Sequence, residues 1–439
     1  MHAAGNADVS ECLKVVVGVA GGIAAYKAAH VVRGFKELGH DVRVVPTESA
    51  LNFVGAATFE ALSGNPVSTT VFDAVDEVQH VRVGQEADLV VVVPATADFM
   101  ARAAHGRADD LLTATLLVAT CPVVLAPAMH TEMWNHPATR DNVATLRRHG
   151  TIVLDPAHGR LTGKDTGPGR LPEPEQIVSL ALAAVENPRH FRRDFEGVRF
   201  MITAGGTREA IDPVRFIGNH SSGRQGFALA EMAAQRGAQV TVVAGHTDQL
   251  PTPLGANVVK VDSTLEMAEA AHEHSKLADV CIFAAAVADF RPASTAGAKM
   301  KKGVADDALS NIQLVENPDI LATTVERRKA GEIPATTTMV GFAAETGDET
   351  TTPLELAKQK IVRKGCDLLM CNDVSGGQTF GATDNVGWLL SLDGEQWDVP
   401  RGSKFSVAGS ILDAVSELRQ EPQPAEWPVP TTATEPLGL

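Results

Sequence analysis

Residue types that bind phosphate and donate hydrogen bonds gather near the middle of the 439-residue chain, in residues 201–226. An apolar stretch there breaks at Gly205 and Gly206, and a helical pattern, FALAEMAAQRG, begins at residue 227. The loop between them carries Arg208, Asp212, Arg215, Asn219, His220, Ser221, Ser222 and Arg224. Glycines after a strand let backbone N–H groups approach a phosphate, and a helix N-terminus favours negative charge. The stretch therefore has the residue types of a phosphate-binding loop.

The elements that position such a loop follow a recurring pattern of strand, turn and helix. Residues 14–22, KVVVGVAGG, predict a strand that ends in a Gly-Gly turn, residues 23–40 an amphipathic helix, and residues 41–48 a second strand. Gly39 suits the end of that helix. The first strand is apolar without alternation, which is typical of a parallel sheet covered on both faces.

Two later stretches repeat one another at a constant offset of 191 residues. ADLVVVVPATADF begins at Ala87 and ADVCIFAAAVADF begins at Ala278. The repeat favours an α/β fold of two doubly wound, Rossmann-like, three-layer domains, although the same pattern is also a common way to begin any central strand. In such sheets ligands bind at the carboxyl ends of the strands.

The remaining segments are assigned by composition and pattern. Strands are predicted at residues 121–130, 151–155, 239–245, 339–346 and 367–374, and helices at residues 175–186, from the NPDI segment at residue 317, and at residues 354–365. Residues 158–174 predict a long loop of the kind that forms lids. Residues 187–196 predict a charged linker, and residues 293–303 a basic loop. Residues 421–439 are rich in Pro, Glu and Thr and predict a disordered tail.

Composition excludes some classes of function. The formal net charge of −16 disfavours nonspecific nucleic-acid binding. No apolar run reaches membrane-spanning length, and the first residues lack the pattern of a signal peptide, so we expect a cytoplasmic protein. The five cysteines include no CxxC pair, which predicts reduced thiols, with Cys121 and Cys281 in the core.

These motifs together resemble the bifunctional flavoprotein of coenzyme A biosynthesis, phosphopantothenoylcysteine decarboxylase fused to phosphopantothenate–cysteine ligase. The first half carries GVAGGIAAYK, PATAD, PAMHTEMW and GPGR, and the second carries TAGGTRE, IDPVRFIGNHSSGRQG, AAVADFRP, KMKK, NPDI, VGFAAET and NDV. The resemblance implies a decarboxylase domain at residues 1–187, a ligase domain at residues 188–420 and a tail at residues 421–439.

For the first half, the resemblance implies a homo-oligomeric enzyme that binds FMN. The flavin oxidises the cysteine thiol to a thioaldehyde, which makes loss of CO₂ possible, and then reduces the enethiolate. His80 matches the catalytic histidine, an acid–base group suited to neutral pH. The implied cofactor-binding residues are Gly21, Gly22, Ile23, Thr47, Thr58, Pro94, Thr96 and Met129.

Two positions in this half depart from the family's pattern. His130 stands where the family usually has an asparagine whose amide donates to a carboxylate at any pH, whereas the charge of histidine depends on pH. Gly163 stands where the flap often carries a proton-donating cysteine. Either Lys164, Asp165 or water replaces that donor, or decarboxylation is impaired.

For the second half, the resemblance implies that CTP and Mg²⁺ activate the carboxylate of 4'-phosphopantothenate as an acyl-cytidylate, which cysteine then attacks. Lys299 matches the lysine that stabilises charge in the first step, and Asn219 matches a residue of the second step. The implied nucleotide-binding residues are Gly205, Gly206, Ser221, Ser222, Phe283, Ala284, Ala285, Asp289, Lys299, Pro318, Asp319, Ile320, Leu321, Phe342, Lys360 and Lys364. The resemblance leaves the metal ligands open. It also implies trimeric contacts through the decarboxylase and dimeric contacts through the ligase, which together build a dodecamer.

Two other hypotheses fit parts of the pattern. Paired α/β halves also occur in nicotinamide-dependent oxidoreductases, but the chain has neither GxGxxG nor a Tyr-x-x-x-Lys pair, and Tyr26 is its one tyrosine. The departures at His130 and Gly163 instead motivate a ligase whose flavin-binding half is regulatory or structural and does not catalyse.

Overall fold

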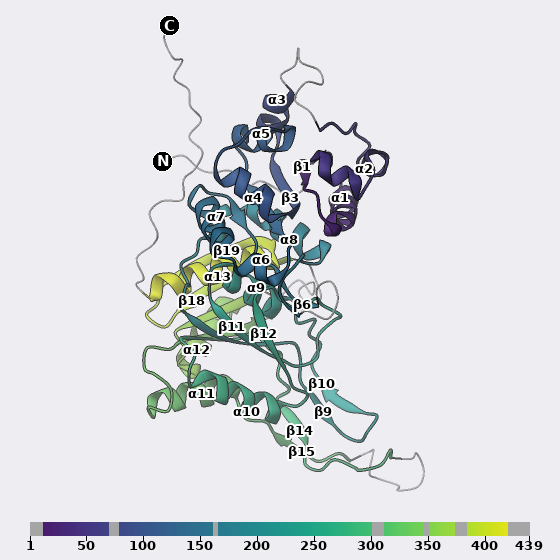
Figure 1. Ribbon diagram of the computed structural model, residues 1–439. Helices are drawn as coiled ribbons and strands as arrows, with labels where there is room; N and C mark the ends of the chain where they lie inside the picture. Colours follow the sequence, from purple (N-terminus) through teal and green to yellow (C-terminus); the bar gives the residue numbers. More distant parts are fainter. Residues whose placement is uncertain are drawn as a thin grey trace. The chain divides into compact units, whose positions relative to one another are not determined.

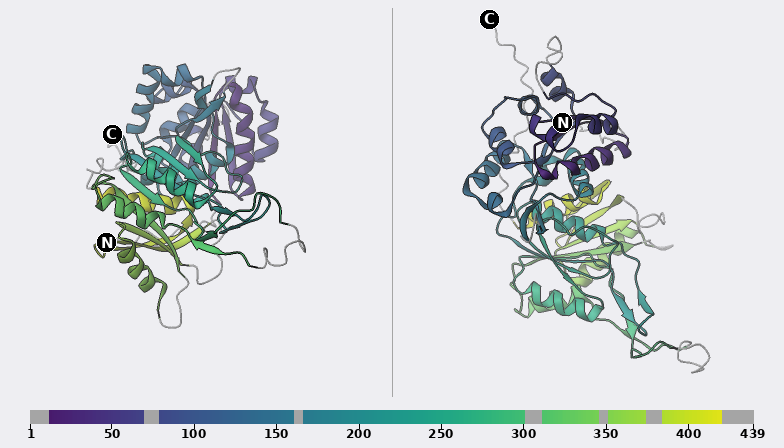
Figure 2. Two further views of the ribbon diagram at one scale, coloured as in Figure 1. Left: turned by 90° about the horizontal axis from the view of Figure 1, so that it is seen from below. Right: turned by 45° about the vertical axis from the view of Figure 1, so that its right-hand side comes forward.

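A computed structural model describes residues 12–69, 79–160, 166–300, 311–345, 351–373 and 384–419. These residues form two compact units, and the chain passes from the first to the second between Phe191 and Arg192. Figures 1 and 2 show that each unit has a sheet with helices on both faces. The fold is therefore α/β with three layers in each unit, as the sequence predicts. Among the described residues, no helix is long and apolar enough to cross a membrane.

The first unit contains a five-stranded parallel sheet in the order β2-β1-β3-β4-β5. Its strands are β1 (Lys14–Val19), β2 (Asp41–Pro46), β3 (Leu89–Ala95), β4 (Val123–Pro127) and β5 (Ile152–Val153). A separate hairpin joins β6 (Ala157–Arg160) and β7 (Thr166–Arg170). The helices are η1 (Ile23–Lys27), α1 (Ala28–Glu37), η2 (Glu48–Asn52), α2 (Ala56–Ser63), α3 (Gln79–Glu86), α4 (Ala97–Ala104), α5 (Leu111–Val118), α6 (Thr131–Asn135), α7 (Pro137–Arg148), α8 (Pro174–Glu186) and η4 (Pro188–Phe191).

Burial explains why these stretches fold as they do. All seven residues of β3 are buried, because helices cover both faces of the central strand. Helix α1 buries Ala28, Val31, Val32 and Phe35, which recur at helical spacing and face the sheet. Helix α1 packs with α8, and α3 packs with α5. Gly39 follows α1 with φ +88°, the left-handed conformation that ends many helices.

The second unit contains an eight-stranded sheet in the order β12-β11-β8-β13-β16-β17-β18-β19, with β18 and β19 antiparallel. The first six strands have the Rossmann order 3-2-1-4-5-6. They are β8 (Arg199–Ala204), β11 (Gln239–Ala244), β12 (Ala256–Lys260), β13 (Val280–Phe283), β16 (Thr338–Glu345) and β17 (Leu368–Asp373), followed by β18 (Asp384–Ser391) and β19 (Gln396–Ser403). The helices are α9 (Arg224–Gln235), α10 (Thr264–Ser275), α11 (Ile320–Lys329), α12 (Pro353–Lys364) and α13 (Lys404–Leu418). Helix α9 packs with α13, while α11 packs with both α10 and α12.

The repeated AD motif has the same structural role in both units. The Asp88 carboxylate accepts the N–H of Lys14 at 2.8 Å, and the Asp279 carboxylate accepts the N–H of Arg199 at 2.9 Å. Each aspartate therefore ties the start of a central strand to the first strand of its unit. The structural similarity between the two stretches ends where the strands end. In the first unit α4 begins at Ala97, whereas in the second unit a loop follows Phe283.

Two hairpins of the second unit leave its sheet and lie side by side (Figure 1). One joins β9 (Arg208–Ala210) to β10 (Phe216–Gly218), and the other contains β14 (Phe290–Pro292) and β15 (Leu314–Glu316). We call the two hairpins together the arm. Four of its apolar side chains are about half exposed or more: Val214, Phe216, Phe290 and Leu314.

The structure corrects three predictions. Residues 158–174 are predicted as a loop, but the hairpin β6–β7 occupies part of them, because Gly and Pro obscure strand periodicity. Asp319 is predicted in the first turn of a helix, but it is the residue that caps α11, accepting the N–H of Ala322 at 3.0 Å. The predicted charged linker, residues 187–196, is not wholly a solvated connection, because Asp194 is buried in an ion pair with Arg236.

Candidate functional site

In the first unit, the carboxyl ends of β1 and β3 meet where the strand order reverses. The N–H of Ala20 donates to the carbonyl of Pro94 at 3.2 Å, and the N–H of Thr47 donates to the carbonyl of Val19 at 2.9 Å. These bonds hold the turns after β1, β2 and β3 beside one another. Three of the predicted cofactor-binding segments are therefore adjacent at the position where doubly wound sheets bind ligands.

Gly21 and Gly22 form a backbone turn that a side chain would fill. A Cβ on Gly21 would lie 2.3 Å from the Ser49 Oγ and 2.8 Å from the Ser49 carbonyl carbon. Gly22 precedes η1 and supplies no side-chain cap, so the first N–H groups of η1 have no partner within the turn. The Thr47 hydroxyl lies 3.0 Å from that of Ser49. Backbone donors and two hydroxyls thus surround a turn suited to a phosphate.

Two more predicted segments border this turn. Thr96 caps α4 by accepting the N–H of Phe99 at 3.3 Å, and its methyl would lie 3.5 Å from a Cβ on Gly22. The N–H of Met129 donates to the carbonyl of Gly169 at 2.9 Å. Gly169 has φ +133°, and a Cβ there would approach the Met129 carbonyl to 2.3 Å. The hairpin β6–β7 is therefore docked on the segment that follows β4.

The other predicted decarboxylase residues are exposed, or their side chains lie outside the described residues. His80 belongs to α3, but its side chain lies outside the described residues, as do Gly163, Lys164 and Asp165. His130 is exposed and precedes α6 without capping it through its side chain. Thr58 is exposed on α2, and within the described residues no hydrogen bond joins its side chain to the other predicted cofactor residues. Ile23 is 72% exposed.

In the second unit, the loop after β8 is held between its two neighbouring strands. The N–H of Gly206 donates to the carbonyl of His246 at 2.9 Å, and the Gly206 carbonyl accepts the N–H of His246 at 2.8 Å. The Gly205 carbonyl accepts the N–H of Ala286 at 2.8 Å. Gly205 has φ +77°, and a Cβ there would lie 2.5 Å from the His246 carbonyl oxygen. Glycine is therefore required by both conformation and contact.

The predicted serine turn leads into α9. Gly223 caps this helix in the left-handed conformation, and a Cβ there would meet Thr247 at 2.4 Å. The Ser221 and Ser222 hydroxyls accept from the N–H groups of Gly223 and Arg224 at the long distances of 3.4 and 3.5 Å. Because both distances are at the weak end of hydrogen bonding, these donors remain available to a ligand.

Asn219 and Asn317 hold the loop that follows β13. The Asn219 side-chain N–H donates to the carbonyl of Val287 at 2.9 Å, and that of Asn317 donates to the carbonyl of Ala288 at 2.8 Å. The backbone N–H of Asn317 also donates to the carbonyl of Asp289 at 2.8 Å. Sequence reasoning did not single out Asn317, although it begins the NPDI motif.

Several predicted nucleotide-binding side chains belong to the core instead. Phe283, Ile320 and Leu321 are 9% exposed or less and pack in one apolar cluster. Any contact they make with a nucleotide in this arrangement would use backbone atoms. Asp289 is exposed, whereas Ala284, Ala285, Pro318, Phe342 and Lys360 are half-buried. Lys364 pairs with Asp319. Partial burial acts to raise the pKa of Asp319, but Lys364 and the N–H of Ala322 hold that pKa below its usual value.

Lys299 lies on the arm and not among the strand ends. The segment that carries it is bonded to the turn of the β9–β10 hairpin at Thr295, Ala296 and Met300. The Lys299 side chain is exposed and forms no hydrogen bond or ion pair with another described residue. Lys299 is therefore carried by the arm, next to the turn that contains Asp212.

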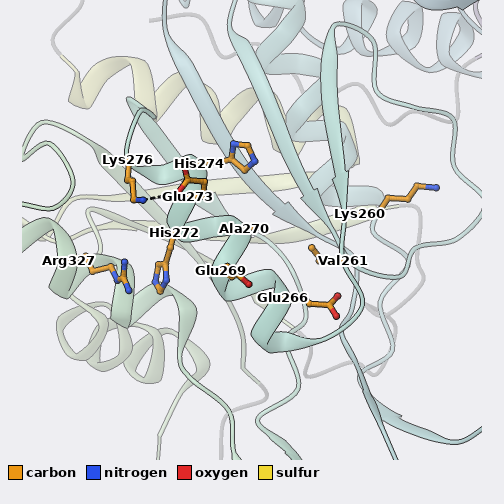
Figure 3. A pocket seen from close by; sticks show the side chains of 10 residues that line it. All are labelled: Lys260, Val261, Glu266, Glu269, Ala270, His272, Glu273, His274, Lys276 and Arg327. Carbon is orange, nitrogen blue, oxygen red and sulfur yellow. Dashed lines mark hydrogen bonds and ion pairs between the residues drawn. The ribbon is translucent and has the colours of Figure 1, made fainter. Parts of the chain in front are cut away.

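A depression of about 820 Å³ lies over α10, away from all predicted site residues (Figure 3). Its lining mixes both signs of charge, with Lys276 paired to Glu273 at 2.7 Å. Burial, and then the charge of Arg327, lower the pKa of His272. In the part of the chain that the structure describes, no group of three or more His, Cys, Asp or Glu side chains could hold a metal ion.

Cys121 and Cys281, the two cysteines predicted in the core, are not suited to act as nucleophiles. All five are unpaired thiols, with Cys281 buried and Cys121 half-buried. Burial raises the pKa of Cys281 to about 12 and that of Cys121 to about 11. Both thiols are therefore protonated at neutral pH, as expected of core residues.

Comparison with known proteins identifies matches over nearly the whole chain. The family described as "DNA/pantothenate metabolism flavoprotein C-terminal domain" matches residues 195–418, and the family described as "Flavoprotein" matches residues 6–186. The "Coenzyme A biosynthesis bifunctional protein CoaBC" of Mycolicibacterium smegmatis is 59% identical over 403 residues, covering 92% of this chain and 97% of the relative.

Two solved structures resemble one unit each. The C-terminal domain of a coenzyme A biosynthesis bifunctional protein CoaBC is 36% identical, with a TM-score of 0.42, and covers 52% of this chain and 97% of that structure. The FMN-dependent cysteine decarboxylase SpaF is 34% identical, with a TM-score of 0.36, and covers 40% of this chain and 99% of that structure.

Proposed function

The chain belongs to the CoaBC family of bifunctional coenzyme A biosynthesis enzymes, and from that membership we propose how its two units work. It is a phosphopantothenate–cysteine ligase and a phosphopantothenoylcysteine decarboxylase. The observation that carries the proposal is the presence, in each unit, of a glycine turn at the strand ends where the sheet order reverses. The second unit makes 4'-phosphopantothenoylcysteine, and the first unit converts it to 4'-phosphopantetheine.

The first unit has residues that fit FMN. The turn has no room for a side chain at Gly21, and Thr47 and Thr96 border it. We assign this turn to the FMN phosphate, with Ile23, Thr58, Pro94 and Met129 around the remainder. When bound, FMN supplies the two-electron chemistry that lets the cysteine carboxylate leave as CO₂. His80 is the proposed proton-transfer group, and His130 the proposed hydrogen-bond donor to the carboxylate.

The second unit is proposed to use CTP with Mg²⁺. The N–H groups of Gly223 and Arg224, which follow the two serines, are only weakly held at the start of α9, where the helix dipole favours phosphate, and the Gly205–Gly206 turn lies beside them. The carboxylate of 4'-phosphopantothenate attacks the α-phosphate and releases pyrophosphate. Lys299 stabilises the charge that grows on the phosphoryl oxygens. The cysteine amine then displaces cytidine monophosphate, while the Asn219 amide stabilises the acyl oxygen.

The arm supports the proposal that the enzyme is a homo-oligomer. Its exposed apolar side chains, Val214, Phe216, Phe290 and Leu314, are 47–60% exposed in a single chain. A second ligase unit that covers them would remove this surface from water. Together with three-fold contacts through the decarboxylase, such pairing gives the proposed dodecamer in the cytoplasm.

One experiment tests both activities. The purified protein is expected to show a flavin spectrum, and to release pyrophosphate and CO₂ when given CTP, Mg²⁺, cysteine and 4'-phosphopantothenate. His80→Asn should keep the flavin and the ligation but lose CO₂ release. A wild-type protein that binds flavin but stops at 4'-phosphopantothenoylcysteine would instead support a ligase with a noncatalytic flavin-binding unit, which the Gly163 and His130 departures favour. Absence of CTP-dependent pyrophosphate release would contradict the ligase assignment.

A further inference from the structure

The segment that carries Lys299 is fastened to the neighbouring hairpin on both sides of that lysine. On one side, the Thr295 hydroxyl donates to the carbonyl of Ala210 at 3.2 Å, and the N–H of Ala296 donates to the carbonyl of Ile211 at 3.0 Å. On the other side, the N–H of Met300 donates to the Asp212 carboxylate at 3.2 Å. Residues 297–299 bridge the two attachments, so their backbone has little freedom to move away from the hairpin.

Asp212 forms the attachment that lies next to Lys299. Its Oδ1 accepts the N–H groups of Val214 and Arg215, both at 2.8 Å, and so closes the turn of the β9–β10 hairpin. Its Oδ2 accepts the N–H of Met300 and the Arg215 Nη1, both at 3.2 Å. The residue is 2% exposed. A buried carboxylate is tolerated because these donors satisfy its oxygens.

Arg215 completes the attachment. Its Nη1 donates to the Met300 carbonyl at 3.3 Å as well as to Asp212. Both the N–H and the C=O of the residue after Lys299 are therefore held, by two residues of one turn. Burial acts to raise the pKa of Asp212, but the N–H groups of Val214, Met300 and Arg215 and the Arg215 charge hold that pKa below its usual value. The carboxylate stays ionised near neutral pH, so titration does not release Met300.

We propose that Asp212 is a positioning residue for the ligase, which holds the backbone at Met300 so that Lys299 is presented in one place during release of pyrophosphate. Because the Lys299 side chain has no partner among the described residues, its location depends on the backbone that carries it. A displacement of about 1 Å of a catalytic group can cost roughly 100-fold in rate. The inference depends on the function proposed above, which supplies the role of Lys299.

Asp212→Asn tests the bond to Met300 separately from the bonds that close the turn. The amide oxygen can still accept from Val214 and Arg215, so the turn is retained. The amide nitrogen, however, is a donor that faces the N–H of Met300 and the Arg215 guanidinium. We expect hydrogen exchange at the Met300 amide to rise at least tenfold. We also expect kcat for CTP-dependent pyrophosphate release to fall about tenfold or more, while KM for CTP changes less than about threefold.

Two further variants distinguish positioning from general damage. Thr295→Val removes only the hydroxyl bond on the other side of Lys299 and leaves the backbone bond from Ala296 to Ile211, so it should change pyrophosphate release less than about twofold. If Asp212 acts through Lys299, then Asp212→Asn combined with Lys299→Gln should be no slower than Lys299→Gln alone. Decarboxylation of supplied 4'-phosphopantothenoylcysteine by the other unit should be unchanged, and a KM for CTP close to that of wild type verifies that the ligase unit itself is folded.

The possible failures are distinct. Unchanged exchange at Met300 in Asp212→Asn would show that the carboxylate does not hold the segment. Faster exchange with normal pyrophosphate release would show that the bond between Asp212 and Met300 does not position Lys299. Either result overturns the inference, as would a double variant markedly slower than Lys299→Gln. If the wild-type protein releases no pyrophosphate from CTP, the proposed function fails, and with it the role of Asp212 in that step.

Discussion

Gly21 and Gly205 illustrate how single residues determine the two proposed phosphate sites. Gly205 requires both a left-handed backbone and a close approach to the His246 carbonyl, whereas Gly21 requires only the close approach to Ser49. In each case the missing side chain lets a backbone turn sit against the end of a neighbouring strand. Both turns lie at the strand ends, at the reversal of strand order where doubly wound sheets bind phosphates.

Gly21→Ala should weaken FMN binding, because the new Cβ would lie 2.3 Å from Ser49 Oγ and the turn must move. Overpacking of this kind costs about 1–3 kcal/mol, which corresponds to roughly a tenfold loss of affinity or more. Flavin absorbance of the purified protein, and titration of the stripped protein with FMN, measure the effect. Gly55→Ala is the matched control, since a Cβ there meets nothing within 4 Å. Equal flavin content in both variants would count against the assignment of this turn.

Lys299 and Asn219 should act in different half-reactions of the ligase. Lys299→Gln should abolish pyrophosphate release, even without cysteine, because the charge on the phosphoryl oxygens loses its cation. Asn219→Asp should still release pyrophosphate, but it should transfer the acyl group poorly to cysteine, because a carboxylate cannot donate to an oxyanion. Acyl-cytidylate should then accumulate, as seen by mass spectrometry of the quenched reaction. Normal pyrophosphate release by Lys299→Gln, or its loss in Asn219→Asp, would reverse these roles.

At the scale of elements, local signals predict most strands of the two parallel sheets and the glycine turns, but not β12, β18 and β19 or the helices α7, α10 and α13. The turns at Gly22 and Gly206 follow apolar strands, so their positions are visible in a few neighbouring residues. The hydrogen bond between Met300 and Asp212 joins residues 88 positions apart, and no local sequence pattern indicates it. Likewise, the apolar character of Phe283 is compatible with a ligand contact or a core position, and only packing distinguishes them.

A buried ionic cluster stabilises the start of the second unit. Composition alone predicts that this segment is a charged linker. Arg236 is fully buried, donates to Asp194 Oδ1 at 2.7 Å and to Asp413 at 2.7 Å, and stacks 4.6 Å from the Phe195 ring. The cluster joins the segment before β8 to α9 and α13. Because a lone buried charge is costly, removal of one partner should destabilise these elements together.

Asp194→Asn should lower the free energy of unfolding by about 3 kcal/mol at pH 7, since Arg236 would lose a buried partner. Burial acts to raise the pKa of Asp194, but Arg236 and Arg192 hold it below its usual value. The folded protein therefore binds this proton less readily than the unfolded chain does. The stabilisation is complete above the unfolded pKa of about 4 and is lost as pH falls toward the lower folded pKa.

Urea unfolding at pH 7 and at pH values between about 5 and 3 measures this difference. The difference in the free energy of unfolding between wild type and Asp194→Asn should become smaller as pH falls. Glu37→Gln is the matched control, because its pair with Arg33 is exposed and should contribute less than about 1 kcal/mol. A gap that stays constant, or widens, toward low pH would mean that the Asp194 carboxylate is not the source of the stability.

At the scale of the whole molecule, the two units separate two chemistries that share one intermediate. The ligase product carries the cysteine carboxylate that the decarboxylase removes, so one chain holds consecutive steps. Each unit has its own sheet and its own strand-order reversal, and each proposed site is built from loops of its own unit. The residues of the cluster at Asp194 all belong to the second unit.

The arm leads to a prediction about assembly. Phe290 is 47% exposed on the arm, and a two-fold contact between ligase units would cover it. Light scattering of the wild-type protein should therefore give a closed particle of about twelve chains. Phe290→Lys should place a charge in that contact and leave particles of about three chains, which keep FMN and decarboxylate 4'-phosphopantothenoylcysteine. Leu277→Lys, at an apolar residue 67% exposed outside the arm, should leave the full particle intact. A wild-type protein that is a stable, active monomer, or a Phe290→Lys particle of unchanged size, would exclude the arm as the contact.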